Sequence, residues 1–396
     1  MGDSGRCPLV LVCPLDWGLG HATRCVPIIR QLETRGFSIL LGGNGESISL
    51  LQQEFPQYRV VNIPGMRIRY GRGKQLWLHS LLQFPAFLMQ MMNEHRAVGK
   101  ICRIHQPQVI ISDNRYGVWC RGRRNILLTH QLHPFMPEGL GWTRALGAAF
   151  IRWISSPFRE IWIPDIPGKQ NLSGELSDIS QGNLQVIRYT GILSRLRGAG
   201  KPETAAIPPD IFVILSGPEP QRSIFERLVY EKFGNSPFTI YVLRGKPGTT
   251  GTAKGWQPVE SPGQKGKLFF RNHLPADELA WYLHHSRLII ARSGYSTLMD
   301  LVELQRTALL VPTPGQPEQE YLGRRMAMLG IFVTSSQEKF SRLEILLPGE
   351  DDASGGKDVI VKKEGVGISM LTAEQELRRF SSAMAGHSLD RILETF

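Results

Sequence analysis

Residues 8–43 read PLVLVCPLDWGLGHATRCVPIIRQLETRGFSILLGG. The apolar run at 8–13 predicts a short, fully buried strand. After a glycine turn, apolar residues recur at helical spacing over 22–34, and Gly36 lies where a helix C-cap is expected. A second strand is predicted at 37–41. A strand, a helix and a strand with short connections form a βαβ unit, which implies a parallel sheet.

The same alternation continues through the first half and begins again after residue 210. The predicted domains are an N-terminal Rossmann-like domain over 1–195, a small, polar, proline-bearing linker over 196–210 and a second Rossmann-like domain over 211–348. A loop is predicted over 349–372 and an amphipathic helix over 373–396. Further strands are predicted at 58–63, 109–112, 125–129, 160–163, 211–215, 238–243, 267–271, 288–291 and 308–312, and helices at 76–102, 143–155, 221–233, 276–284, 297–304 and 318–329. The fold class is therefore α/β, with two doubly wound domains.

Length and composition agree with this organisation. The chain has 396 residues, of which 42% are hydrophobic and 20% charged, as in ordinary globular proteins of two domains. Five cysteines without a CxxC motif argue against a disulfide framework and a zinc ribbon. No signal peptide and no membrane-spanning run is recognisable, so a cytoplasmic location is expected.

The net charge of +11 lies almost entirely in the first half. Residues 1–195 hold 22 Lys and Arg against 12 Asp and Glu, whereas the numbers in 196–396 are 24 and 23. Nucleic acid, an anionic membrane surface or a phosphorylated substrate could use this excess, and so could a solvated surface without a partner. No nucleic-acid-binding module is recognisable, so no nucleic-acid partner is predicted.

The first candidate site is the GLGH turn at 18–21, directly after the first strand. Ligands of open parallel sheets bind at the carboxyl ends of the strands, where glycines let backbone N–H groups approach an anion. His21 opens the next helix, and its ordinary pKa of about 6.5 suits a general base. Asp113 also follows a strand and could orient His21, although an Asx turn would explain it equally well.

The second half contains two similar turns. Ser216-Gly217 follows a strand and precedes a helix, which is the geometry of a phosphate-binding turn. The stronger motif is RSGYSTLMDLVE at 292–303, followed by PTPGQPEQE at 312–320. Its Ser-Gly turn can hold an anion at a helix start, Asp300 lies one helical turn after Thr297 and can accept from ribose hydroxyls, and Gln316 and Gln319 follow the next strand.

GLGHATR, RSGYSTLMDLVE and PTPGQPEQEY together resemble glycosyltransferases of the GT-B fold. The similarity is greatest to the family 28 enzymes, which include the N-acetylglucosaminyltransferase that forms lipid II. The resemblance implies two Rossmann-like domains that face a central cleft, with the acceptor on the first and a nucleotide-sugar on the second. It also implies inversion at the transferred sugar and no metal ion or resident cofactor, since the UDP-sugar is a co-substrate.

The resemblance implies roles for individual residues. His21 is the expected catalytic base, and Asp113 orients it. The expected donor-binding residues are Gly18, Gly20, Arg195, Ser216, Gly217, His273, Leu274, Gly294, Ser296, Thr297, Asp300 and Gln319. Asp300 replaces the usual ribose-binding glutamate, with Glu303 as a substitute, and Glu320 stands where a second glutamine is common.

The acceptor expected from the resemblance is a glycolipid, another lipid-linked molecule or a cell-envelope precursor. The apolar run at 76–92, preceded by Arg67, Arg69, Arg72 and Lys74, suits docking on an anionic membrane face, although a core helix would show the same pattern. Two other functions fit the motifs: a nucleotide-sugar 2-epimerase of the same fold, and a non-catalytic nucleotide-sugar-binding protein.

Overall fold

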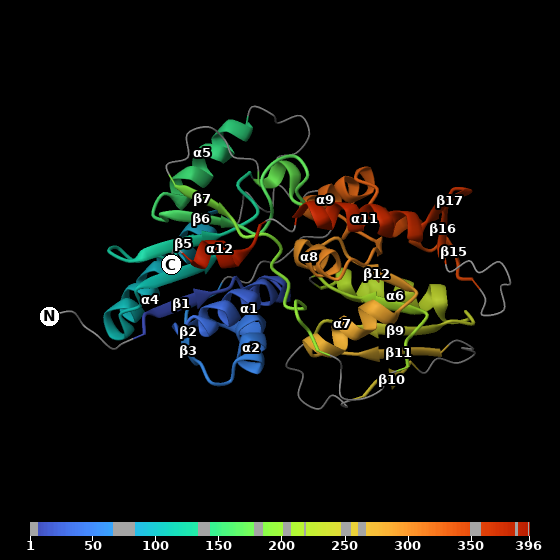
Figure 1. The fold of residues 1–396 in the computed structure, drawn as a ribbon, viewed down its shortest axis with the longest axis horizontal. Helices are drawn as coiled ribbons and strands as arrows, with labels where there is room; N and C mark the ends of the chain where they lie inside the picture. The colour runs from blue at the N-terminus through green and yellow to red at the C-terminus, as the bar shows by residue number, and fades with distance from the viewer. Residues whose placement is uncertain are drawn as a thin grey trace. The chain divides into compact units, whose positions relative to one another are not determined.

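The computed structural model describes residues 7–65, 84–133, 143–177, 185–200, 207–217, 219–246, 255–259, 267–348, 358–384, 387–394 and 396 (Figure 1). The chain divides into two compact units. Unit 1 consists of Met1–Arg195 together with Met384–Phe396, and unit 2 of Leu196–Ala383.

Unit 1 is built on a seven-stranded sheet of order β3-β2-β1-β4-β5-β6-β7, in which all neighbours are parallel. Its strands are β1 (Leu9–Cys13), β2 (Ser38–Gly43), β3 (Arg59–Asn62), β4 (Val109–Asp113), β5 (Arg124–Leu128), β6 (Glu160–Ile163) and β7 (Val186–Tyr189). The helices are α1 (Leu19–Thr34), α2 (Gly45–Glu54), α4 (Phe84–His105), α5 (Thr143–Ser155), the 3-10 helix η1 (Gly174–Ser177) and α12 (Leu389–Leu393).

Unit 2 repeats this design with the order β10-β11-β9-β8-β12-β13-β14, parallel except for β10. Its strands are β8 (Ile211–Ile214), β9 (Thr239–Leu243), β10 (Gln257–Pro258), β11 (Lys267–Arg271), β12 (Leu288–Ala291), β13 (Leu309–Leu310) and β14 (Val333–Thr334). The helices are α6 (Gln221–Phe233), α7 (Ala276–His285), α8 (Tyr295–Glu303), α9 (Pro317–Met328), α10 (Gln337–Phe340) and α11 (Met370–Met384). A separate antiparallel sheet holds β15 (Glu344–Leu346), β16 (Ile360–Lys363) and β17 (Val366–Ser369).

The predicted βαβ unit forms at the start of unit 1. Val10, Leu11, Val12 and Cys13 of β1 are fully buried, because helices cover a parallel sheet on both faces. The helix predicted over 22–34 begins three residues earlier, and its Ala22, Cys25, Val26, Ile29 and Leu32 are buried at the predicted helical spacing. Both units therefore have the predicted doubly wound architecture.

Several elements differ from the prediction. The helix predicted over 76–102 is α4, whose first turn contains Pro85 where proline is tolerated, and 76–83 lie outside the described residues. The predicted loop over 349–372 contains β16 and β17, because Val361 packs into the unit 2 core. The single helix predicted over 373–396 is two helices, and its last part belongs to unit 1.

The beginning of the predicted linker packs onto unit 2. Leu196 is 2% exposed. Arg197 donates to Glu303 through Nε (2.8 Å) and Nη2 (2.7 Å), and the Gly200 N–H donates to Asp277 Oδ1 (2.9 Å). Residues 201–206 lie outside the described residues. The first part of the segment is thus held by tertiary contacts rather than extended between domains.

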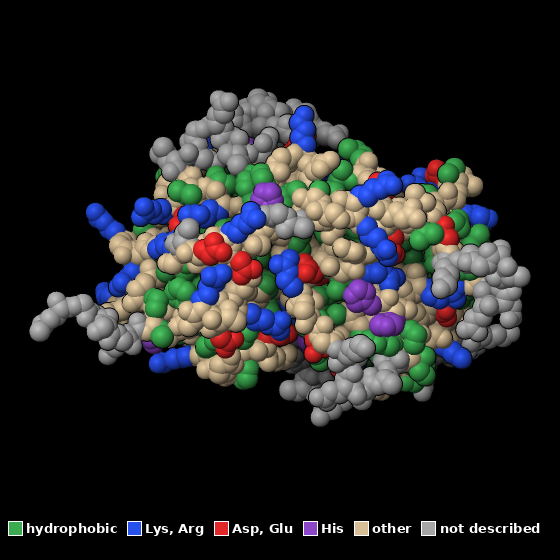
Figure 2. All heavy atoms as spheres, in the orientation of Figure 1, with side chains coloured by type: hydrophobic (Ala, Val, Ile, Leu, Met, Phe, Trp, Pro, Cys, Tyr) green, Lys and Arg blue, Asp and Glu red, His purple; other side chains and the backbone are tan. Residues whose placement is uncertain are grey.

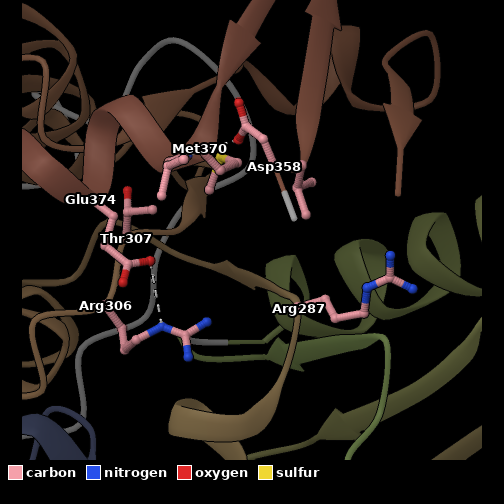
Figure 3. A pocket seen from close by; sticks show the side chains of 8 residues that line it. Arg287, Arg306, Thr307, Asp358, Met370 and Glu374 are labelled. Carbon is pink, nitrogen blue, oxygen red and sulfur yellow. Dashed lines mark hydrogen bonds and ion pairs between the residues drawn. The ribbon is translucent and has the colours of Figure 1, made fainter. Parts of the chain in front are cut away.

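A small pocket of about 60 Å³ shows how α11 is attached to unit 2 (Figure 3). Arg306 donates to the carbonyl of Ser286 (2.7 Å) just after α7, and its Nε lies 3.8 Å from Glu374 of α11. Figure 3 shows these two side chains pointing toward one another across the pocket. The space suffices for about one or two water molecules, so it is a packing feature and not a substrate site.

The strand order fixes where a ligand site is expected in each unit. In both sheets the order reverses beside the first strand, between β1 and β4 in unit 1 and between β8 and β12 in unit 2. Ligands of doubly wound sheets bind at the carboxyl ends of the strands at this reversal. The GLGH turn and Asp113 follow β1 and end β4, while the Ser216 and Gly294 turns follow β8 and β12.

Candidate functional site

His21 and Asp113 lie together at the strand-order reversal of unit 1. His21 comes from the first turn of α1, and Asp113 is the last residue of β4. His21 Nδ1 lies 3.1 Å from Asp113 Oδ2. The carboxylate is completely buried, whereas 17% of the His21 side chain is exposed, so the ring can reach a bound molecule.

Arg24 completes this cluster, and the sequence patterns did not single it out. Arg24 is 1% exposed, and its Nε donates to Asp113 Oδ2 (2.9 Å) while Nη2 donates to Asp113 Oδ1. Arg24 Nη1 lies 3.1 Å from Nδ1 of the buried His130, which follows β5. The signal was present in GLGHATR, because Arg24 lies three residues after His21 on the same face of α1.

The cluster presents a choice of tautomer for His21. Arg24 Nη2 lies 2.8 Å from the same Nδ1 atom that Asp113 approaches. A neutral imidazole nitrogen either donates or accepts, so each tautomer satisfies one of these contacts. With the proton on Nδ1, His21 donates to Asp113 and its Nε2 can accept a proton. With the proton on Nε2, Nδ1 accepts from Arg24 and the exposed side of the ring is a donor.

Burial and the neighbouring charges set the protonation of the cluster. Burial lowers the pKa of His21 and Arg24 adds to this, while Asp113 opposes it. Burial alone would raise the pKa of Asp113, but Arg24 and His21 hold it below its usual value. The cluster therefore contains a carboxylate paired with a guanidinium and an uncharged imidazole at neutral pH.

The lowered pKa of His21 predicts a pH-dependent stability. As the pH falls below about 6.5, His21 takes up a proton in the unfolded chain before it does so in the folded one. The free energy of unfolding should therefore fall between pH 7.5 and 5.5, with a His21 contribution of up to about 1 kcal/mol. Urea unfolding of the parent and of His21→Gln at both pH values measures this contribution. His284, whose pKa burial also lowers, contributes to the fall in both proteins. An equal fall in the parent and in His21→Gln would therefore leave no contribution from His21 and would contradict the prediction.

The glycines of the first turn shape its entry into α1. Gly18 is the N-cap of α1 and has φ 103°, which disfavours any residue with a side chain. Its carbonyl lies 3.3 Å from the Ser47 hydroxyl that donates to it, and the carbonyl of Gly20 accepts from Thr23 Oγ1 (3.0 Å). The turn is thus held from α2 as well as from α1.

The two predicted anion-binding turns of unit 2 differ in charge. Glu219 lies at the start of α6, where it accepts from the Ser223 N–H (3.2 Å) and from Arg222 (2.7 Å). Burial opposes ionisation of Glu219, but these hydrogen bonds lower its pKa to about 2. The first turn of α8, which contains Ser296 and Thr297, has no acidic residue, and its N-cap is Gly294. Of the two helix starts, α8 is therefore the better site for a phosphate.

A buried arginine lies directly beside the α8 turn. Arg292 is 0% exposed and donates to the carbonyls of Val311 (3.0 Å) and Gln221 (3.1 Å) and to Gln337 Oε1 (2.7 Å). Its guanidinium also lies 4.1 Å from the centre of the Phe225 ring. In the described part of the chain it has no carboxylate partner, so it adds a positive charge to the carboxyl edge of the unit 2 sheet.

The residues after β13 hold one another in a defined loop. Gln319 Oε1 accepts from the Thr313 N–H (3.0 Å), and Glu320 Oε1 accepts from the Gly315 N–H (2.9 Å). The Ser293 hydroxyl donates to the carbonyl of Gln319 (2.7 Å). A Cβ on Gly217, which has φ 100°, would lie 3.5 Å from Thr313 Oγ1. The structure thus brings the turns after β8, β12 and β13 together.

The remaining predicted donor-binding residues have different surroundings. Glu303 is engaged by Arg197, and Asp300 is the other carboxylate of α8. His273 and Leu274 follow β11, two strands from β8 on the same edge, and Leu274 is fully buried. Arg195 belongs to unit 1, is 5% exposed and lies 3.4 Å from Glu54 of α2.

The described part of the chain shows neither a cluster of metal ligands nor a membrane-spanning helix. Within the described ranges, no three His, Cys, Asp or Glu side chains are grouped as metal ligands. None of the described helices is long and apolar enough to cross a membrane. The five cysteines are all free thiols.

The chain is similar to known glycosyltransferases in sequence and in structure. Residues 271–334, which include the α8 turn, match the glycosyltransferase family 28 C-terminal domain. A protein of Methanosarcina mazei described as an uncharacterized glycosyltransferase is 23% identical over 322 residues, which cover 79% of this chain and 81% of the relative. The glycotransferase of kitacinnamycin has a similar structure, with a TM-score of 0.61, 14% identity and 99% of each chain covered.

The spinosyn rhamnosyltransferase SpnG is a further structural neighbour. In its complex with thymidine diphosphate it has a TM-score of 0.60 and 14% identity, with 98% of this chain and 99% of SpnG covered. SpnG has also been solved with the spinosyn aglycone. The chain is therefore a GT-B protein similar to family 28 glycosyltransferases, as its motifs predicted. These likenesses support glycosyltransferase activity.

Proposed function

We propose that the protein transfers a sugar from UDP-N-acetylglucosamine or another UDP-hexose to an acceptor hydroxyl, with inversion and without a metal ion. The observation that carries this proposal is the cluster of His21, Asp113 and Arg24 at the strand-order reversal of unit 1. It supplies an uncharged imidazole, partly exposed and backed by a buried carboxylate, which is what a general base requires.

In the proposed reaction, His21 acts with its proton on Nδ1, donating to Asp113, so that Nε2 removes the proton of the acceptor hydroxyl. The hydroxyl oxygen forms a bond to the anomeric carbon, and the bond from that carbon to the phosphate oxygen breaks. The diphosphate leaves with the bonding electron pair. Attack from the face opposite the leaving group inverts the anomeric carbon.

The negative charge of the leaving diphosphate needs stabilisation on the donor side. The start of α8 at Gly294, Ser296 and Thr297 is the proposed phosphate site. The buried Arg292 guanidinium, which donates to the carbonyls of Val311 and Gln221, adds a fixed positive charge to the same edge of the unit 2 sheet. Preorganised dipoles and charges of this kind stabilise charge that develops in a transition state. Asp300 is proposed to bind the ribose, while Gln319, whose Oε1 accepts from the Thr313 N–H, is proposed to donate to the sugar through its amide NH₂.

The choice of a pyrimidine nucleotide is supported by SpnG, whose complex contains thymidine diphosphate. We expect UDP and UDP-sugars to raise the melting temperature more than GDP or NAD do, because a ligand that binds only the folded state stabilises it by mass action. A thermal-shift panel with UDP, UDP-N-acetylglucosamine, UDP-glucose, UDP-galactose, dTDP, GDP and NAD measures this. A shift with dTDP alone would contradict the uridine donor, and no shift at all would contradict nucleotide-sugar binding.

The alternative functions are separated by their products. A transferase releases UDP only when an acceptor is present, and the sugar appears on that acceptor. A nucleotide-sugar 2-epimerase changes the sugar without any acceptor, and a sensor binds the donor without turnover. A coupled assay for UDP, run with and without acceptor, therefore distinguishes the three functions.

The acceptor is proposed to be lipid-linked, such as a glycolipid or cell-envelope precursor, and the protein to be cytoplasmic and peripheral on the membrane. Described aromatic residues of α4 and α5 form an apolar surface in which Phe84 and Phe150 have ring centres 5.2 Å apart and Phe150 and Trp153 5.9 Å. Trp153 is 64% exposed and Met89 58%. The basic residues at 67–74 and the apolar residues at 76–83 lie outside the described part of the chain.

We expect this α4–α5 surface to bind vesicles that contain anionic lipid. Replacing Trp153 and Met89 together with serine should reduce flotation with vesicles several-fold, because about 25 cal/mol is lost per Å² of apolar surface kept from the bilayer. The matched control replaces two exposed apolar residues of unit 2, Ile207 and Met328, with serine. No flotation of the parent at low salt, or an equal loss in both variants, would contradict membrane docking by this surface.

A further inference from the structure

A cavity of unit 1 lies at the opposite edge of the sheet from His21. It measures about 600 Å³ and is lined at the amino ends of β5, β6 and β7 by Arg123, Arg124, Arg159, Glu160 and Arg188. Because all strands of this sheet are parallel, their amino ends lie on the edge away from Asp113, which ends β4. The cavity is therefore separate from the candidate active site.

Glu160 organises the base of this cavity. Its Oε1 accepts from Arg124 Nε (2.7 Å), and its Oε2 accepts from Arg188 Nε (3.1 Å) and from Trp162 Nε1 (3.2 Å). The carboxylate is 6% exposed, and although burial disfavours its charge, these three donors lower its pKa. Arg124 is also held by the Phe396 ring, whose centre lies 4.4 Å from the guanidinium carbon. Arg124 and Arg188 are thus fixed in place, with 23% and 30% of their side chains exposed.

The other two arginines are not neutralised. Within the described residues, neither Arg123 nor Arg159 forms an ion pair, so four guanidinium groups face one carboxylate. Figure 2 shows Lys and Arg side chains spread over the part of unit 1 that carries β5, β6 and β7. This cavity gathers part of the basic excess of the first half of the chain, and the proposed transfer reaction uses none of these residues.

We propose that this arginine cavity binds the diphosphate group of a small molecule. A guanidinium presents a planar pair of donors that matches phosphate oxygens in two-point contacts, so several arginines around one space favour a ligand with more than one phosphate. The volume falls within the roughly 300–1,000 Å³ of small-molecule sites. The negative charge of Glu160 offsets one of the four guanidinium charges. The cavity should therefore attract a monovalent anion less strongly than a diphosphate, which carries more charge. The inference stands independently of the proposed transferase activity.

The test uses the full chain and inorganic pyrophosphate as the probe, measured by isothermal titration calorimetry at fixed ionic strength. The double variant Arg123→Gln/Arg159→Gln removes the two unpaired charges and leaves the Glu160 contacts in place. Its affinity should fall about a hundredfold or more, since two charge-assisted hydrogen bonds are lost. The matched control, Arg59→Gln/Arg96→Gln, removes two exposed charges elsewhere in unit 1 and should bind like the parent.

The outcomes separate binding in this cavity from binding elsewhere on the protein. Pyrophosphate binding at unit 2 would persist in both double variants. The difference in pyrophosphate affinity between the two variants therefore reports binding in the arginine cavity alone. Equal affinity in the two double variants would overturn the proposal. The proposal would also be overturned if vesicles of anionic phospholipid bind through Arg123 and Arg159 while pyrophosphate does not bind, since the partner would then be a membrane. Thermal unfolding of each variant establishes that it is folded.

Discussion

His21→Ala is expected to lower turnover by about two to four orders of magnitude, because a positioned general base contributes that much. The expectation rests on the position of His21, which is partly exposed in front of a buried carboxylate. Donor binding should be nearly unchanged, since the donor is proposed to bind unit 2. The measurement is kcat and KM for UDP release with acceptor, together with the thermal shift caused by UDP.

The control for this variant is His105→Ala. His105 ends α4 and lies just before the start of β4, on the other edge of the unit 1 sheet from Asp113. Its replacement should leave kcat within about twofold of the parent, as surface changes away from a site generally do little. Near-normal turnover in His21→Ala would remove His21 from the role of base, while a loss of UDP binding would indicate a role in holding the donor.

Asp113→Leu is expected to cost about 3–5 kcal/mol of stability, which is the usual effect of leaving a buried charge without its partner. Arg24 is 1% exposed, and two of its donors bind Asp113. Its guanidinium also lies beside the rings of His21 and His130, which do not replace a carboxylate. Chemical unfolding at neutral pH, where Asp113 is fully ionised in the parent, measures the loss.

A second variant separates the charge effect from a simple packing defect. Arg24→Met/Asp113→Leu replaces the buried pair with apolar side chains, and such replacements are often neutral or stabilising. The double variant should therefore recover most of the stability that Asp113→Leu loses. It should not recover turnover, because His21 would lose the carboxylate that orients it. Equal instability of the single and double variants would contradict the ion-pair explanation.

The fold was predictable from the sequence because its signals are local. The buried strand at β1, the helical spacing of α1 and the glycine turn between them lie within a few dozen residues. Among the elements that were not predicted, α2 follows a glycine-rich turn and β14 has two residues, so both carry weak signals. The prediction for the tail was wrong although a local signal was present. β16 and β17 pair across the two-residue turn Glu364-Gly365, whose φ values of 51° and 84° suit a tight hairpin, and Val361 also packs into the unit 2 core.

The candidate site was predictable only in part. Strand ends and helix starts pointed to His21, Asp113 and the α8 turn, because parallel topology brings these positions to one edge of each sheet. The sequence did not show that Arg24 binds Asp113, that Arg195 lies beside Glu54 or that Glu219 occupies the start of α6. Each of these depends on the direction of a long side chain, which spacing along the chain does not define.

The sequence by itself therefore determined the α/β class, the two doubly wound units and the strand ends where chemistry is expected. The tertiary structure decided which charges meet there. Residues 21 and 24 are neighbours on one helix, but their shared partner is 92 and 89 positions further along the chain. Local periodicity sets secondary structure, whereas the pairing of buried charges depends on the packing of distant strands, because a buried ion is stable only beside its counterion.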